Sequence, residues 1–128
     1  MRILLDTHAF LWFIAGDPKL SLDARSLIAD SDTLLFLSAA SLWEIAIKAS
    51  LGKLTLLESY ETLIHRQLSQ NSITLIPTEL KHFTALLNLP HHHRDPFDRL
   101  IIVQALVEEL AIVTKDSFFS PYPVHCIW

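Results

Sequence analysis

Short runs of consecutive apolar residues alternate along the chain with longer segments whose apolar positions recur at helical spacing. The short runs predict strands at residues 3–5, 34–37, 73–76, 111–113 and 124–127. The longer segments predict helices at residues 7–15, 21–29, 39–50, 58–69, 79–87 and 96–110. Strands that are apolar on both faces and separated by helices are typical of a parallel sheet covered on both sides. The pattern therefore predicts the α/β fold class.

Length and composition indicate the number of domains and exclude several kinds of binding site. The 128 residues, of which 51% are hydrophobic, predict one folded domain over residues 1–128 rather than a disordered chain. The two glycines, Gly16 and Gly52, lie too far apart for a Walker A loop or a dinucleotide-binding turn. The single cysteine, Cys126, excludes a disulfide framework and a cysteine-based zinc site within one chain. No apolar stretch has the length of a membrane span or a signal peptide, so we expect a cytoplasmic protein without membrane contact.

Two acidic residues follow predicted strands. Asp6 comes directly after the first strand, and Asp116 follows the strand at 111–113 after two intervening residues. In open α/β sheets, sites form beyond the carboxyl ends of the strands, so both residues are well placed for chemistry. Each also has a simpler interpretation, because Asp6 can cap the next helix and Asp116 can be an ordinary loop residue.

Two further acidic residues lie on predicted helices. Glu44 belongs to a helix that is apolar almost all round, where a carboxylate is costly unless it is paired or bound to a cation. Ser41 and Glu44 also match a capping box, and Glu44 and Lys48 match a favourable i,i+4 ion pair. At the start of the last predicted helix, Asp95 suits the N-cap position. Asp98 falls in the first turn, where it either complements the helix dipole or holds a metal.

The four acids are most informative together, since two come from strand ends and two from helices that can face them. Carboxylates that are gathered without basic partners repel one another. A hard divalent cation relieves this repulsion, and oxygen ligands suit Mg²⁺, with Mn²⁺ as the alternative. The sequence therefore predicts a Mg²⁺ or Mn²⁺ site made by Asp6, Glu44, Asp98 and Asp116.

Four segments of the chain also carry a resemblance to a known family. They are Leu4 to His8 (LLDTH), Ser41 to Lys48 (SLWEIAIK), His92 to Arg99 (HHRDPFDR) and Val113 to Asp116 (VTKD). They occur in the family's order over nearly the whole chain, and the HRDPFDR run is a specific match. The chain resembles the PIN-domain ribonucleases, specifically the VapC-type toxins of bacterial toxin–antitoxin pairs.

The resemblance implies a three-layer α/β/α sandwich with a central parallel sheet. It implies a catalytic metal site formed by Asp6, Glu44, Asp98 and Asp116 and supported by the hydroxyl groups of Thr7 and Thr114. It further implies that the substrate is RNA and that the protein partners are a second copy of the chain, as a homodimer, and a cognate antitoxin.

The resulting hypothesis is metal-dependent hydrolysis of an RNA phosphodiester bond by an activated water. The basic residues beside the acids are predicted to contact RNA phosphates, namely Lys48, Arg94, Arg99 and Lys115. Their alternative role is ion pairing, with Lys48 on Glu44 and the arginines in ordinary surface pairs. Two other function classes stay open. One is a metal-dependent phosphatase or DNA nuclease with the same site, and the other is a non-catalytic α/β binding module whose acids are caps and ion pairs.

Three consecutive histidines, His91 to His93, precede the last predicted helix. Adjacent residues cannot all turn toward one ion on a regular element, so a loop at the rim of an RNA groove is favoured over a zinc site.

The net charge first argues against a nucleic-acid partner, because 14 acidic residues outnumber 10 basic ones to give −4. Without the four predicted ligands, 10 acids face 10 bases. A bound divalent cation reverses the local sign, so phosphate becomes a favourable ligand there. We therefore expect RNA binding that depends on the metal and is confined to one groove.

Overall fold

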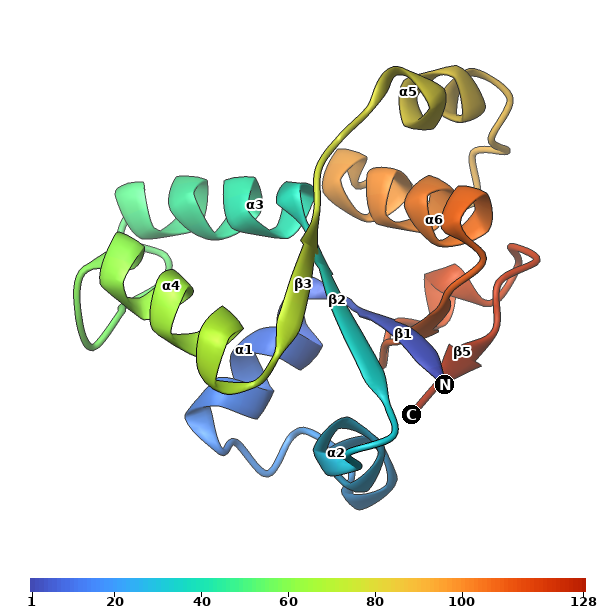
Figure 1. Ribbon diagram of the computed structural model, residues 1–128. Coiled ribbons are helices and arrows are strands. Elements are labelled where there is room, and N and C mark those ends of the chain that lie inside the picture. Colours follow the sequence, from blue (N-terminus) through green and yellow to red (C-terminus); the bar gives the residue numbers. More distant parts are fainter.

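A five-stranded parallel sheet forms the centre of the computed structural model, which describes all 128 residues (Figure 1). The strands are β1 (Arg2–Leu5), β2 (Leu34–Ser38), β3 (Ile73–Ile76), β4 (Ala111–Val113) and β5 (Cys126–Ile127). Their order across the sheet is β3-β2-β1-β4-β5, and every neighbouring pair is parallel. The carboxyl ends of all five strands therefore lie at one edge of the sheet, where sites form in folds of this kind.

Six helices and one short 3-10 turn connect the strands. The helices are α1 (Thr7–Ala15), α2 (Leu22–Ala29), α3 (Ala39–Ser50), α4 (Tyr60–Gln70), α5 (Leu80–Leu87) and α6 (Pro96–Glu108), and the turn is η1 (Ser117–Phe119). In Figure 1 the sheet is seen from its β3 edge, with α1 and α4 on one side and α5 and α6 on the other. The predicted three-layer α/β/α arrangement with a parallel sheet is confirmed.

Alternation along the strands explains why both faces of the sheet are covered. Ile3 and Leu5 point into one core, which α1, α2 and α4 complete, whereas Leu4 points into a second core under α5 and α6. All three side chains are fully buried. Each such burial stabilises the fold by roughly 1.5–3 kcal/mol, so a strand with two apolar faces holds both layers in place.

Several predicted boundaries differ from the structure for identifiable reasons. The predicted helix 96–110 ends at Glu108, because Glu109 adopts a left-handed conformation (φ 56°) that turns the chain into β4. The predicted strand 124–127 is reduced to Cys126–Ile127, and the helix predicted at 58–69 occupies residues 60–70. The prediction also lacked η1, which Asp116 caps by accepting a hydrogen bond from the Phe118 N–H.

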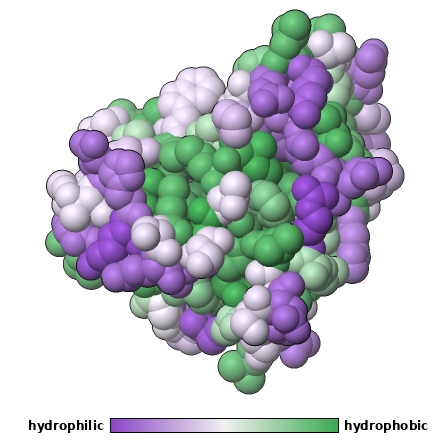
Figure 2. All heavy atoms as spheres, viewed as in Figure 1, coloured by the Kyte–Doolittle hydropathy of each residue, from purple (hydrophilic) through white to green (hydrophobic).

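The outer surface carries both hydrophobic and hydrophilic regions. None of the helices combines the length and the apolar character that crossing a bilayer requires. Figure 2 shows hydrophobic side chains gathered across the middle of the face seen in Figure 1, over the edge strand β3, where Leu75 is 39% exposed. Hydrophilic side chains flank this region on both sides.

Candidate active site

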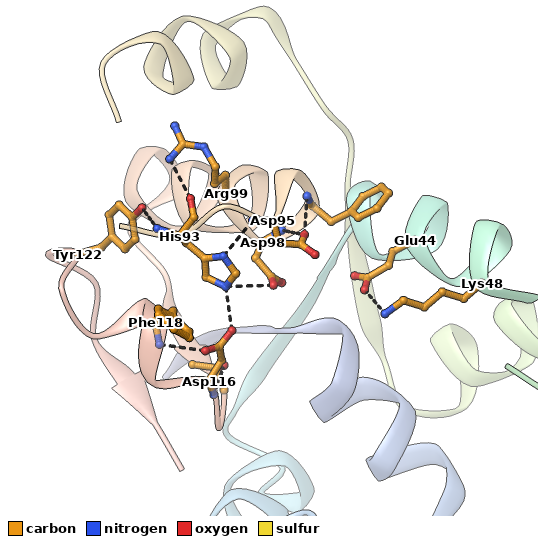
Figure 3. Close-up of polar contacts among 11 residues, drawn as sticks. Glu44, Lys48, His93, Asp95, Asp98, Arg99, Asp116, Phe118 and Tyr122 are labelled. Carbon is orange, nitrogen blue, oxygen red and sulfur yellow. Dashed lines mark hydrogen bonds and ion pairs between the residues drawn. The ribbon is translucent and has the colours of Figure 1, made fainter. Parts of the chain in front are cut away.

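The four acids predicted from the sequence come from four different elements and meet at the carboxyl edge of the sheet. Asp6 directly follows β1, and Asp116 follows β4, which is hydrogen-bonded to β1, after two intervening residues. Glu44 lies on α3, which follows β2, and Asp98 lies in the first turn of α6. We call these four residues the carboxylate cluster. Figure 3 shows Asp98 and Asp116 directed toward each other, with Glu44 facing them from α3.

Asp98 is the residue in which the crowding of this site is clearest. Burial is the largest cause that raises its pKa, and the neighbouring charges of Asp95, Glu44, Asp6 and Asp116 add to it. Together they raise the pKa of Asp98 from 3.8 to about 8. Burial and like charges both disfavour the ionised form of Asp98, so positive charge brought to this site would favour its ionisation.

Asp6 combines a structural role with a place in the cluster. Its Oδ1 accepts a hydrogen bond of 2.7 Å from the Ala9 N–H, so the predicted cap of α1 is present. Burial raises the pKa of Asp6, and the Asp116 charge adds to the rise. Hydrogen bonds from the Thr114 side chain and the Ala9 N–H, and the charge of His8, lower the pKa and offset part of the rise. Asp6 can therefore cap α1 and belong to the carboxylate cluster at the same time.

Glu44 keeps one oxygen paired and one oxygen free. The Nζ of Lys48 lies 2.6 Å from Oε2, so the predicted i,i+4 ion pair is present. The other oxygen, Oε1, is buried and has no hydrogen-bond partner. The capping-box interpretation of Ser41 and Glu44 is wrong, because Ser38 caps α3 and the Ser41 hydroxyl instead accepts a hydrogen bond from Thr7.

Asp116 is held more tightly than the other members of the cluster. Its Oδ1 accepts a hydrogen bond from the Phe118 N–H, and its Oδ2 lies 2.8 Å from His93 Nε2. Its own N–H donates to Thr114 Oγ1. The two threonines that were expected to support the site make different contacts: Thr114 accepts from the Asp116 N–H, and Thr7 donates to Ser41 on α3.

His93 is the site residue that the sequence analysis missed. It is buried, and its Nε2 is 3.2 Å from Asp98 Oδ2 as well as 2.8 Å from Asp116 Oδ2. The expected rim loop fits its exposed neighbours His91 and His92, whereas His93 turns inward (Figure 3). The available signal was its position two residues before Asp95, which caps α6 and whose N–H bonds to the His93 ring.

The predicted phosphate-binding residues divide into three groups. Arg94 and Lys115 are exposed beside the cluster, and Lys48 is half-buried in its pair with Glu44. Arg99 is buried, and its guanidinium donates to the carbonyl oxygens of Leu89, Pro90 and His93. This corrects the prediction for Arg99, which fastens the loop before α6 and forms neither a phosphate contact nor a surface ion pair.

Two clefts open beside the carboxylate cluster. One has a volume of about 270 Å³ and is lined by Asp6, His8, Trp12, Lys115 and Asp116. The other, of about 600 Å³, is lined by the 91–95 loop and Phe118. Both are open to solvent, and the first is lined directly by two of the four acids, Asp6 and Asp116.

The donor set fits a hard divalent cation. Ligand atoms of Asp98, Asp116 and the His93 ring lie within 4.8 Å of one another. The charges of Asp6 and Glu44 act on Asp98, and Glu44 has a buried oxygen without a partner. Oxygen donors of this kind suit Mg²⁺ or Mn²⁺, whereas structural zinc prefers several nitrogen or sulfur ligands. The residues present therefore fit the cation that the sequence predicts.

Comparisons with known proteins agree in the fold they indicate. A family model described as PIN domain matches residues 3–123. The chain is 31% identical over 130 residues to ribonuclease VapC22 of Mycobacterium tuberculosis, with 98% of both chains covered. The structure is similar to that of VapBC2 from Rickettsia felis bound to a DNA fragment from their promoter. The TM-score is 0.74 at 18% identity, over 99% of this chain and 98% of that one. FitAcB from Neisseria gonorrhoeae matches with a TM-score of 0.68 at 18% identity, covering 98% and 96% of the two chains.

Proposed function

Because the chain belongs to the PIN-domain family, we propose that it is a metal-dependent endoribonuclease that acts as the toxin of a toxin–antitoxin pair. The ribonuclease that it resembles over almost its full length supports the reaction class. The carboxylate cluster supports the metal dependence, and we assign catalysis to Asp6, Glu44, Asp98 and Asp116.

One observation carries the proposal, namely that the cluster's negative charge is not compensated within the chain. Lys48 is the only lysine or arginine paired with a member of the cluster, and it meets only one oxygen of Glu44. The pKa of Asp98 is raised to about 8 as a consequence of burial and neighbouring carboxylates. A fold that gathers acids at this cost is expected to bind a cation, since buried charges are otherwise paired.

Asp6, Glu44, Asp98 and Asp116 are the residues that would hold Mg²⁺ or Mn²⁺. Both oxygens of Asp116 also accept hydrogen bonds from the chain, and these bonds fix the orientation of its carboxylate. When bound, such an ion supplies an activated water and neutralises charge on the phosphate. The chain's own contribution is to fix the carboxylates at the carboxyl edge of the sheet, with Asp6 and Asp116 anchored to backbone N–H groups.

The substrate contacts that we propose are modest in number. Arg94 is exposed and lines one of the two clefts, Lys115 is exposed and lines the other, and Lys48 is paired with Glu44. Each can contact a phosphate without reading a base, so these residues position the RNA strand. We further propose a cognate antitoxin and a second copy of the chain as protein partners, acting in the cytoplasm.

The test is cleavage of single-stranded RNA, single-stranded DNA and a small phosphomonoester by the purified chain, with Mg²⁺, Mn²⁺ or EDTA. We expect RNA cleavage with either ion and none with EDTA. Asp6→Asn should lose several kcal/mol of transition-state stabilisation, or about 100-fold or more in rate. Asp23→Asn, on the exposed first turn of α2, is the matched control and should cleave like the wild type.

Each other outcome has a defined meaning. Cleavage of DNA or of the phosphomonoester in preference to RNA would replace the proposed substrate. Equal cleavage by Asp6→Asn and the wild type would contradict the assignment of the site.

A further inference from the structure

The protonation of the His93 ring follows from its hydrogen bonds. The Asp95 N–H donates to His93 Nδ1 over 3.1 Å, so this nitrogen carries a lone pair and no proton. The neutral ring then carries its proton on Nε2, the nitrogen that faces Asp116 and Asp98. Because the Asp95 N–H occupies Nδ1 of His93, Nε2 is the nitrogen that can donate a hydrogen bond.

The ring has little freedom to leave this orientation. The His93 N–H donates to the Tyr122 hydroxyl, and the His93 carbonyl accepts from Arg99. The rings of Phe118 and Phe119 stand edge-on to the imidazole, with centroids 5.8 Å and 5.4 Å away. Both the backbone and the ring plane are therefore fixed by neighbours that lie outside the carboxylate cluster.

We propose that His93 is a positioning residue that donates its Nε2 proton to the carboxylate of Asp116 and, with Asp98 Oδ2 only 3.2 Å from the same nitrogen, holds the two carboxylates side by side for the cation. This inference rests on the proposed function, because the cation is the reason for holding the two carboxylates together. With Nε2 2.8 Å from Asp116 Oδ2 and 3.2 Å from Asp98 Oδ2, one N–H keeps the two carboxyl groups together before any ion arrives. His93 is not itself a ligand, since one ring nitrogen carries a proton and the other accepts from Asp95.

Two substitutions separate this role from simple packing. In His93→Gln the side-chain amide group can take the place of Nε2, which keeps the donor to the carboxylates and loses the acceptor for Asp95. In His93→Asn the amide oxygen can take the place of Nδ1, which keeps the acceptor and loses the donor. The corresponding changes at His65, which is exposed on α4, are the matched controls.

Binding of Mn²⁺ is measured by calorimetry for the wild type and the variants, together with kcat and KM for RNA. We expect His93→Asn to bind Mn²⁺ about 10–100-fold more weakly and to lose kcat, as when a partner of a metal ligand is removed. His93→Gln should retain most of both, and the His65 variants should match the wild type. Equal effects of Asn and Gln, or a larger effect of Gln, would overturn the positioning role and leave a packing role.

A readout without metal keeps this inference separate from the proposed function. In the metal-free wild type, ¹⁵N NMR should show a proton on Nε2 of His93 and none on Nδ1. The carboxyl ¹³C signals of Asp98 and Asp116 should move in His93→Asn and stay close to the wild type in His93→Gln. A proton on Nδ1, or signals indifferent to both variants, would refute the inference. A wild type with this tautomer that binds no Mn²⁺ would refute the metal site alone.

Discussion

Two buried histidines of this chain are held in nearly the same way. His82 Nδ1 accepts from the Glu79 N–H over 3.0 Å, and its Nε2 lies 2.9 Å from Glu108 Oε1. His93 Nδ1 accepts from the Asp95 N–H over 3.1 Å, and its Nε2 lies 2.8 Å from Asp116 Oδ2. Each ring thus receives a backbone N–H on one side and meets a carboxylate on the other.

The charges around the two rings differ. At His82, the Nζ of Lys81 lies 2.9 Å from Glu108 Oε1, and the hydrogen bond from Lys81 is the largest cause that lowers the pKa of Glu108. At His93, several carboxylates meet and the pKa of Asp98 rises to about 8. The first arrangement pairs its carboxylate with a lysine of the chain, whereas the second is the one for which we propose a cation. Charge balance, more than the presence of a buried histidine, distinguishes a structural contact from a candidate site.

The largest expected contrast is in catalysis. Asp98→Asn should reduce RNA cleavage in Mg²⁺ by about 100-fold or more, because it removes a carboxylate from the metal site. Glu108→Gln, the equivalent change at the balanced histidine, should cleave RNA at the wild-type rate. Rates measured under single-turnover conditions check both variants. Similar losses in the two would mean that fold stability, and not the metal site, controls the activity.

The next contrast is in stability. His82→Ala should lower the free energy of unfolding by about 2–4 kcal/mol, because it leaves a cavity and the Glu79 N–H without its partner. RNA cleavage by the folded fraction should be unchanged. Urea unfolding of the wild type and the variant measures this loss of unfolding free energy. A variant as stable as the wild type would show that the His82 contacts contribute nothing to the fold.

The pH dependence of stability should have opposite signs at the two places. The folded pKa of Asp98 is about 8 against an ordinary 3.8, so between these values the folded chain holds a proton that the unfolded chain has lost. Unfolding releases that proton, and metal-free stability should therefore fall as pH rises from about 4 to about 8. In EDTA, Asp98→Asn should remove this fall and gain roughly 1–2 kcal/mol at the alkaline end.

The smallest effect concerns Glu108, whose pKa is lowered by hydrogen bonds from Lys81 and His82. A lowered pKa contributes stability above the ordinary value of 4.5, and this contribution is lost as pH falls through the folded value. Glu108→Gln should therefore flatten only the acid limb of a melting-temperature profile, whereas Asp98→Asn flattens the limb between pH 4 and 8. If Glu108→Gln flattened the limb between pH 4 and 8 and Asp98→Asn the acid limb, the contrast drawn between the two histidine sites would be contradicted.

The sequence predicted the fold and the positions of the acids because both depend on local pattern. Strands with two apolar faces require covering helices. Asp6 directly follows one strand, and Asp116 follows the neighbouring strand after two residues. The caps by Asp6 and Asp95 were also predictable, since they depend on the first turn of one helix. Glu44 could be singled out because a carboxylate in an apolar helix needs a partner.

The residues that were missed or misassigned depend on how distant segments fold together. Arg99 is structural because the 89–93 loop turns back and presents three carbonyl oxygens to it. His93 joins the site because Asp95 and Tyr122 orient its backbone and ring. A run of three histidines does not show which ring turns inward, and spacing alone does not fix a tautomer.

The most direct test of the central claim is the amount of free Mn²⁺ left in solution with the metal-free protein, measured by electron paramagnetic resonance. The wild type and Glu108→Gln should remove Mn²⁺ from the free signal in a saturable way. Asp98→Asn should bind it at least about 10-fold more weakly. Equal binding by all three proteins, or no binding by the wild type, would contradict a cation site in the carboxylate cluster.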